Sequence, residues 1–210
     1  MINKKRILLA DDHKFITESL RSTLEPQYEV VGVVEDGHQL VKEALRLRPD
    51  VMVVDISMPR LNGIEAVRQL NKKDLSAKVI FLTMHADVTY ATRALETGAA
   101  GFILKHSAPT ELLEAIEKAL LGKIHISPRI AKELDKTAPN RKDPIRKLSP
   151  RQREVLQLLG EGNSAKQVAD ILCISARTVE FHKYRIMEEL GVHNSAELVQ
   201  YAIKLGIVTL

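Results

Sequence analysis

The sequence contains one cysteine, no tryptophan and no long apolar run. A single thiol, Cys173, excludes an intrachain disulfide, and a reducing compartment is the natural environment for such a chain. Cys173 lies within an apolar helical pattern, so we expect it to pack in a core. No apolar run approaches the roughly 18–20 residues of a membrane span, and the first residues lack the apolar core of a signal peptide. We therefore expect a cytoplasmic protein with no membrane partner.

A large excess of charge of one sign is also absent. The chain has 31 Lys and Arg against 27 Asp and Glu, a formal net charge of +4 and a pI near 9.1. Most of the excess lies after residue 140, where 11 basic residues stand against 8 acidic ones. Such mild basicity is compatible with polyanion binding but does not establish it. The length and the hydrophobic content of 45% favour two domains, each with its own core.

The stretch from residue 50 to 63 organises the first part of the chain. Val51–Val54 form an apolar tetrad that is bounded by breakers and is too short for an ordinary helix, which predicts a strand buried on both faces. Asp55 follows at the carboxyl end of that strand. Because ligands bind at this edge of an open parallel sheet, a carboxylate there indicates a chemical role. Pro59 and Gly63 predict a fixed loop that holds Asp55 in place.

Strand and helix patterns alternate along residues 1–121. Short apolar runs of strand length recur five times, and each is followed by residues with the apolar spacing of a helix. Five such pairs predict a doubly wound, five-stranded parallel α/β sheet. We expect strands at 6–10, 28–36, 51–55, 77–83 and 100–105, and helices at 15–24, 37–49, 64–70, 88–96 and 109–121.

Three carboxylates are predicted to gather at one edge of this sheet. Asp11 and Asp12 follow the first strand and Asp55 ends the third, so the fold would bring them together. Such a group stays ionised near neutral pH only if a cation compensates, and hard oxygen ligands suit Mg²⁺ (or Mn²⁺). Taken alone, Asp11 and Asp12 could instead cap the first helix. Thr83 and Lys105, at the tips of the fourth and fifth strands, favour a phosphate site, because a hydroxyl and an ammonium would complete it.

With these motifs, residues 1–121 resemble the flavodoxin-like receiver domain of two-component response regulators. The matching residues are Asp11-Asp12, Asp55 followed by MPRLNG, Thr83, and Lys105 within GFILK. The resemblance implies that Asp55 accepts a phosphoryl group from a sensor histidine kinase. It also implies a metal held by Asp12, Asp55 and the backbone carbonyl of Ser57, with Asp11 acting through water. A carboxylate can attack a phosphoryl group whose developing charge is shared between Mg²⁺ and a lysine.

The resemblance further implies a switch. Thr83 would move toward the new phosphoryl group, which adds about one to two negative charges. In the family, that movement makes room for an aromatic residue three positions before the lysine, which here is Phe102. Phe102 has no hydroxyl, so one polar contact is lost, and it could also be a static core residue. Ser57 and His85 flank the site, where side chains in the family tune the lifetime of the phosphoryl group.

Residues 148–210 show only helical patterns, after a predicted linker at 122–147 that contains several prolines and a short helix at 129–135. We expect a small all-α domain of four helices. Capping boxes at Ser149 and Ser164 begin the first two helices, Gly191 ends the third and Asn194 caps the fourth. The short turn at Ile174-Ser175 has the spacing of a helix-turn-helix unit.

This helical part resembles the LuxR-type DNA-binding domain, so the whole chain resembles the NarL/FixJ class of response regulators. The third helix would enter the major groove of double-stranded promoter DNA. At about 100° per residue, Val179, Ile186 and Leu190 share one face of it, and the opposite face carries two aromatic residues beside charges. We expect DNA contacts from Lys166, Arg177, Thr178, Glu180, Phe181, His182, Lys183, Tyr184 and Arg185.

Some of these contacts can be assigned a partner by chemistry. Phe181 could meet a thymine methyl, and Glu180 could accept from cytosine N4. Glu180 departs from the basic residue that some relatives carry, so their target sequences do not transfer. Each basic residue taken singly could equally be a solvated surface charge. The apolar face of the last helix could be core or a dimer seam, and the resemblance favours a homodimer on DNA.

Two other functions stay open at this point. A regulator could bind DNA without phosphorylation control and keep its receiver as a dimerising scaffold. A Mg²⁺-dependent phosphohydrolase could use an aspartyl phosphate, but such enzymes typically need a second aspartate two residues after the nucleophile, where this chain has Ser57. We therefore expect a transcriptional regulator that auto-dephosphorylates, not a turnover enzyme.

Overall fold

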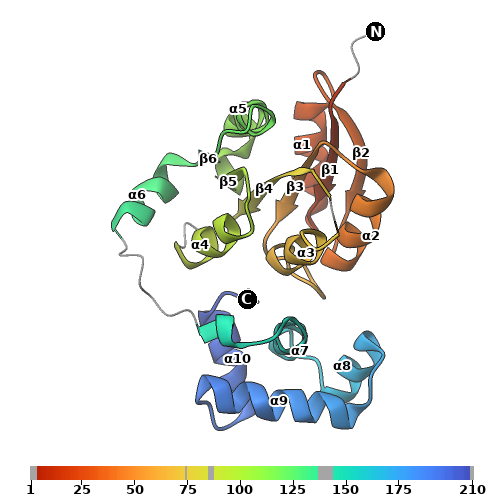
Figure 1. Cartoon of the computed structure of the whole chain (residues 1–210), viewed down its shortest axis with the longest axis vertical. Coiled ribbons are helices and arrows are strands. Elements are labelled where there is room, and N and C mark those ends of the chain that lie inside the picture. Colours follow the sequence, from red (N-terminus) through yellow and green to blue (C-terminus); the bar gives the residue numbers. More distant parts are fainter. Residues whose placement is uncertain (1–3, 74, 85–87, 137–143, 209–210) are drawn as a thin grey trace. The chain divides into compact units, whose positions relative to one another are not determined.

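The computed structural model describes residues 4–73, 75–84, 88–136 and 144–208. The chain divides into two compact units, residues 1–138 and 139–210 (Figure 1). Part of the stretch that was expected to be a linker therefore belongs to the first unit, where it forms a short strand and the helix α6 (Pro128–Lys136). Residues 137–143 of that stretch lie outside the described residues.

Within its described residues, the first unit is built on a parallel sheet of six strands, with the order β2-β1-β3-β4-β5-β6. The strands are β1 (Arg6–Ala10), β2 (Glu29–Val34), β3 (Val51–Asp55), β4 (Lys78–Thr83), β5 (Gly101–Leu104) and β6 (His125–Ile126). All neighbouring strands are parallel. The strand order reverses at β1, so the tips of β1 and β3 border the crevice where this class of fold binds ligands. The doubly wound fold is confirmed.

The expected strand count of five was one too low. The backbone N–H of His125 donates to the carbonyl of Ala100 at 2.9 Å, and that of Ser127 donates to the carbonyl of Phe102 at 3.0 Å. These bonds add β6 to the outer edge of β5. A strand of two residues is too short to produce an alternating pattern, so no periodicity marks it in the sequence.

Helices cover both faces of the sheet (Figure 1). Alternate strand residues point to opposite faces, and they sort into two cores: Ile7 and Leu9 share one core with Leu112 of α5, whereas Leu8 and Ala10 belong to the other. One core is covered by α1 (Lys14–Leu24) and α5 (Ala108–Leu120), and the other by α2 (Gly37–Leu47), α3 (Gly63–Leu70), α4 (Val88–Glu96) and α6. Because strands buried on both faces are apolar throughout, the short runs in the sequence were sufficient to locate β1 and β3.

The loop between β3 and α3 is held at several points. Gly63 lies so close to β3 that a Cβ atom there would be 2.1 Å from the carbonyl oxygen of Asp55, so only glycine fits. Arg60, which has a φ of 66°, forms an ion pair with the fully buried carboxylate of Asp36. The Asn62 side chain accepts from the backbone N–H of Glu65 at 3.0 Å and caps α3. The fixed loop predicted from the sequence is thus confirmed.

The second unit contains the four expected helices: α7 (Pro150–Gly160), α8 (Ala165–Leu172), α9 (Ala176–Leu190) and α10 (Ser195–Lys204), after a 3-10 turn, η2 (Pro144–Lys147). Ser149 and Ser164 both form capping boxes, Asn194 caps α10, and Gly191 ends α9 with a φ of 67°. The expectation that Cys173 packs in a core was wrong. Cys173 ends α8 in the left-handed conformation, with a φ of 52°, and its side chain is exposed.

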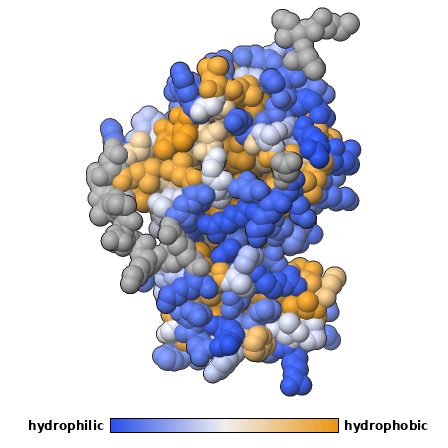
Figure 2. Space-filling model, in the orientation of Figure 1, coloured by the Kyte–Doolittle hydropathy of each residue, from blue (hydrophilic) through white to orange (hydrophobic). Residues whose placement is uncertain are grey.

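The surface of the first unit carries few large apolar side chains. On the face drawn in Figure 2, hydrophobic surface gathers over the region of α5 and β6, where Leu121 and Ile124 are 73% and 61% exposed. Among the described residues, no helix is long and apolar enough to cross a membrane.

Candidate functional site

Three charged side chains meet at the carboxyl edge of the sheet, where β1, β3 and β5 end. The ammonium nitrogen of Lys105 lies 2.8 Å from Oδ2 of Asp11 and 2.8 Å from Oδ2 of Asp55. Each of the three side chains is only 2% exposed. Lys105 therefore bridges two buried carboxylates. When both are ionised, the group keeps an excess of one negative charge.

The ends of the strands place these groups. Asp11 directly follows β1, and its backbone N–H donates to the carbonyl of Val34 at 3.0 Å. Lys105 follows β5 and begins a 3-10 turn, η1 (Lys105–Ser107). Thr83 is the last residue of β4 and is buried. Because these strands are parallel neighbours, their carboxyl ends lie at one edge of the sheet, as the sequence predicted.

Asp12 and His13 lie at the rim of the same group. Nδ1 of His13 is 3.0 Å from Oδ1 of Asp12 and 3.1 Å from Oδ1 of Asp11. The backbone N–H of His13 also donates to Oδ1 of Asp11 at 2.9 Å. The interpretation of the sequence did not include His13, although its position directly after the acidic pair is a signal that points to it. His13 adds a nitrogen to a set of oxygen ligands.

The arrangement fits a divalent cation. One potential ligand atom from each of Asp11, Asp12, His13 and Asp55 lies within 4.8 Å of the others. Oδ2 of Asp11 and of Asp55 are buried and, among the described residues, have no hydrogen-bond donor of suitable geometry, although the Lys105 ammonium is in ionic contact with both. Buried carboxylate oxygens with spare acceptor capacity are the ligands that a hard cation prefers.

Three other residues of the predicted site have different positions. Ser57 is half-buried, and its backbone N–H forms a hydrogen bond with the carboxylate of Asp55. Phe102 is fully buried and lies opposite Phe81 in the register of β4 and β5, in the core that α4 covers. His85 lies outside the described residues. The structure thus brings Asp11, Asp12, Asp55, Thr83 and Lys105 to one edge and places Phe102 inside the adjoining core.

In the second unit, α9 presents a polar face that carries two aromatic rings. Val179, Ile186 and Leu190 are buried, as the helical spacing predicted. Phe181 and Tyr184 are 59% and 66% exposed. Of the remaining residues expected to contact DNA, four are exposed and three are half-buried: Lys166, Arg177, Glu180 and Arg185 in the first group, and Thr178, His182 and Lys183 in the second.

Two contacts shape this face of α9. The guanidinium of Arg185 lies 5.9 Å from the centre of the Phe181 ring, a cation–π distance that holds the exposed ring beside a positive charge. Partial burial, and then the positive charge of Arg151, lower the pKa of His182. Both effects favour the neutral form of the His182 imidazole.

Comparison with known families identifies both units. Residues 7–117 match the response regulator receiver domain, and residues 146–202 match the bacterial regulatory proteins of the luxR family. The chain is a DNA-binding response regulator of the NarL/FixJ class. This response regulator thus joins a receiver domain to a LuxR-type DNA-binding domain.

Relatives resemble this response regulator over nearly its full length. The transcriptional regulatory protein DegU of Brevibacillus brevis is 33% identical over 226 residues, which cover 98% of this chain and 96% of DegU. RcsB of Salmonella enterica serovar Typhimurium, solved on a promoter with the phosphomimetic BeF3−, has a TM-score of 0.65 and 30% identity and covers 95% of this chain and 98% of its own. A structure of two RcsB dimers bound to two parallel DNAs has a TM-score of 0.63 and 31% identity, covering 99% and 100% of the two chains.

The buried Asp55 gives the response regulator a predicted pH dependence. Burial, and to a lesser extent the charge of Asp11, raise the pKa of Asp55 from its ordinary 3.8 to about 6, although Lys105 and the Ser57 N–H act in the opposite direction. Between these values the folded chain keeps a proton that the unfolded chain has released. The free energy of unfolding should therefore fall as the pH rises through this window, by up to about 1.4 kcal/mol per pH unit.

Urea unfolding from pH 4 to 7, in the presence of a chelator, measures this dependence. The Asp55→Asn variant is the control, since it keeps every other titrating group. The free energy of unfolding of the wild-type chain should decline relative to that of the variant as the pH rises. Parallel curves for the two proteins would contradict the raised pKa.

Proposed function

We propose that this response regulator is switched by phosphorylation of Asp55, with a sensor histidine kinase as the phosphoryl donor. The observation that carries the proposal is the contact of Lys105 with both Asp11 and Asp55 at 2.8 Å. A structural ion pair needs only one carboxylate. Two buried carboxylates around one ammonium leave negative charge that a bound cation would balance, at the edge of the sheet where ligands of this fold bind.

The side chains of the site would have different roles in phosphoryl transfer. The carboxylate of Asp55 attacks phosphorus and forms an acyl phosphate, while the bond from phosphorus to the histidine nitrogen of the kinase breaks. Lys105 donates to the phosphoryl oxygens as their charge develops. Asp12, Asp55 and the backbone carbonyl of Ser57 would hold Mg²⁺ or Mn²⁺, with Asp11 acting through water. The bound cation would supply further positive charge for those oxygens.

The acyl phosphate would change the packing behind the site. Thr83, at the end of β4, can donate its hydroxyl to the new phosphoryl oxygens. Its movement would alter the space beside Phe102, which is fully buried on the neighbouring strand. The face formed by α4 and β5 would then change shape. Phe102 lacks a polar group, so its position would follow packing alone.

The second unit would read promoter DNA through α9. Aromatic and charged side chains at the surface of this helix match what a major groove offers: phosphates for Arg177 and the half-buried Lys183, a thymine methyl for Phe181 and a cytosine amino group for Glu180. The similar RcsB has been solved as dimers on DNA, and we extend the dimer to this chain in its active form. A regulator that binds promoter DNA would act in the cytoplasm.

The reaction would end by hydrolysis of the acyl phosphate, which restores the carboxylate of Asp55. The chain then acts as a timed switch and releases one phosphate for each phosphorylation event. A phosphohydrolase would need a further acid two residues after Asp55, and Ser57 occupies that position. The absence of that acid favours slow auto-dephosphorylation over turnover.

DNA affinity measured with and without a phosphodonor tests the proposed function. Bound DNA would first be selected from a random pool, and its affinity for the full chain would then be measured with Mg²⁺, with and without acetyl phosphate. We expect labelling to tighten binding roughly 5- to 150-fold, the usual range of coupling between two sites. Equal affinity of fully labelled and unlabelled chain would instead support a regulator without phosphorylation control. Release of many phosphates per chain each minute would support a hydrolase.

A further inference from the structure

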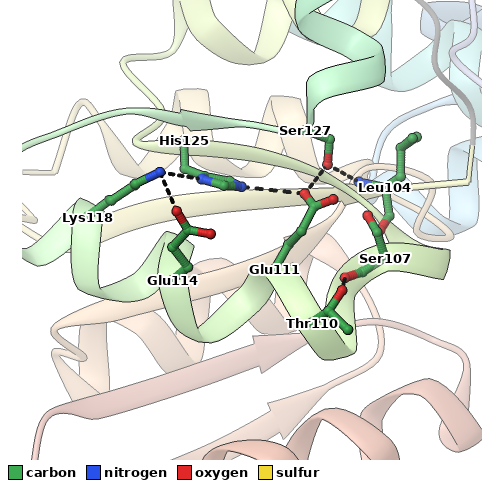
Figure 3. A network of polar contacts seen from close by, with 8 residues as sticks. All are labelled: Leu104, Ser107, Thr110, Glu111, Glu114, Lys118, His125 and Ser127. Atoms are coloured by element: carbon green, nitrogen blue, oxygen red, sulfur yellow. Dashed lines mark hydrogen bonds and ion pairs between the residues drawn. The ribbon is translucent and has the colours of Figure 1, made fainter.

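A network of polar side chains joins the end of β5 to α5 and to the segment formed by β6 and α6 (Figure 3). At its centre is Ser127, which is 1% exposed. Its hydroxyl accepts from the backbone N–H of Leu104 at 3.2 Å and donates to Oε2 of Glu111. Its own backbone N–H donates to the carbonyl of Phe102 at 3.0 Å. Ser127 thus contacts both ends of the stretch from Phe102 to Leu104.

The same serine directly precedes α6. Its carbonyl accepts from the backbone N–H of Ile130 at 2.9 Å and from that of Ala131 at 3.0 Å. Ile130 is fully buried in the core that also contains Tyr90 and Ala91 of α4. Ser127 is therefore bonded to the first turn of α6, and that turn packs against α4.

Glu111 is itself held by a second partner. Nε2 of His125 lies 3.4 Å from Oε2 of Glu111, and Nδ1 of His125 lies 3.3 Å from the ammonium nitrogen of Lys118. Because an ammonium can only donate, Nδ1 must be the acceptor in this arrangement, so the proton is on Nε2 and points to Glu111. Oε2 of Glu111 thereby accepts hydrogen bonds from both Ser127 and His125, the two residues on either side of Ile126 (Figure 3).

We propose that Ser127, held by Glu111, is a positioning residue for the phosphorylation site and the point where the signal enters the connection to the DNA-binding domain. Lys105 immediately follows Leu104, so the hydrogen bond from Leu104 to Ser127 fixes the backbone that carries the lysine. Phe102, the aromatic residue of the switch, is bonded to the same serine through its carbonyl. The inference rests on the proposed function, because it assumes that the site around Asp55 is phosphorylated.

Coupling of this kind acts in both directions. If phosphorylation changes how β6 and α6 are held on the sheet, then loosening β6 and α6 must change how readily the phosphorylated state forms. A serine that only stabilised the fold would lower the free energy of unfolding and leave this response to phosphorylation intact. The response, not the stability, therefore separates the two roles.

The test compares four full-length chains: wild type, Ser127→Ala, Glu111→Ala and the control Glu114→Ala. Glu114 is on the same helix as Glu111 and pairs with Lys118 at 2.6 Å, but it makes no contact with Ser127 among the interactions of the described residues. Each chain is labelled with acetyl phosphate and Mg²⁺ while the rate of labelling is followed by mass spectrometry. Hydrogen exchange over residues 125–136 and DNA affinity are then measured with and without label.

We expect Ser127→Ala and Glu111→Ala to be labelled about tenfold more slowly, because a small displacement of Lys105 weakens its contact with the reacting phosphoryl group. In both variants, exchange over residues 125–136 should lose its dependence on phosphorylation, and DNA affinity should change less than threefold on labelling. The control should behave as wild type. If Ser127→Ala fails to fold, Glu111→Ala decides, since the Glu111 side chain is 21% exposed and its loss leaves no large cavity.

The inference is overturned if Ser127→Ala and Glu111→Ala both keep the wild-type labelling rate and the wild-type responses of hydrogen exchange and DNA affinity to phosphorylation. The proposed function would then still stand. If the wild-type chain itself shows neither labelling nor a response to the phosphodonor, the proposed function fails, and the positioning role fails with it. Equal losses in Glu114→Ala would also overturn the inference, because the effect would then belong to α5 as a whole.

Discussion

Replacing Asp55 with asparagine is expected to abolish phosphoryl labelling of the chain, whereas the wild-type chain should gain one phosphate from acetyl phosphate and Mg²⁺. The amide is close in size to the carboxylate, so the fixed loop and the strand end should keep their places. An amide nitrogen or oxygen is a poor nucleophile, and the variant also removes one of the two charges that Lys105 bridges. The reaction therefore loses its attacking group, and the expected effect is total loss.

Intact-mass spectrometry followed by peptide mapping measures the label. Asp50→Asn is the matched control, because Asp50 lies just before the other end of the same strand and pairs with Lys5 at 2.9 Å. That variant should be labelled at the wild-type rate. Wild-type labelling of Asp55→Asn would refute the acceptor, and a label that moved to Asp11 would show that Lys105 serves the pair without selecting between its members.

DNA affinity is expected to fall at least about tenfold when Arg177 and Lys183 of α9 are both replaced with alanine. Arg177 is exposed in the first turn of the helix, and Lys183 lies two turns further on, 3.8 Å from the carboxylate of Glu180. If each contacts a phosphate, the slope of log affinity against log salt should fall by about one for each residue. If either residue also contacts a guanine edge, its removal would cost a further ~1–3 kcal/mol of binding free energy, so affinity should fall at least about tenfold.

Fluorescence anisotropy with the selected DNA, at several salt concentrations, measures both quantities. Lys204→Ala is the control for the general effect of positive charge, since Lys204 is an exposed base in the same domain that lies on α10 and rests over Tyr201 at 6.0 Å. The control should lose little affinity and keep its salt slope. An unchanged salt slope in the double variant would contradict the assignment of α9 to the major groove.

Most of the receiver could be predicted because its central strands, β1, β3, β4 and β5, are almost entirely buried on both faces. Each of the first five strands is a short apolar run, and the carboxylates and Lys105 follow those runs directly, so the positions of the strands fixed the positions of the charges. The helix starts at Ser149 and Ser164 were equally predictable. A capping box is a local motif, and both partners lie within three residues of each other.

The features that sequence reasoning missed depend on contacts between distant segments. Ser127 meets Leu104 across 23 residues, and no local pattern marks a serine for such a bond. β6 has only two residues, too few to show alternation. The apolar neighbours of Cys173 predict a helical residue, but α8 ends one residue earlier and the chain turns there. His13 was overlooked although it adjoins the acidic pair.

The close approach at Gly63 constrains how this receiver can vary. A methyl group at that position would lie 2.1 Å from the carbonyl oxygen of Asp55 and would clash with it. The first residue of α3 therefore packs directly against the backbone of the proposed acceptor. Engineering that retunes the lifetime of the signal must therefore work through side chains around the acceptor, such as Ser57. The main chain between them offers no room for adjustment.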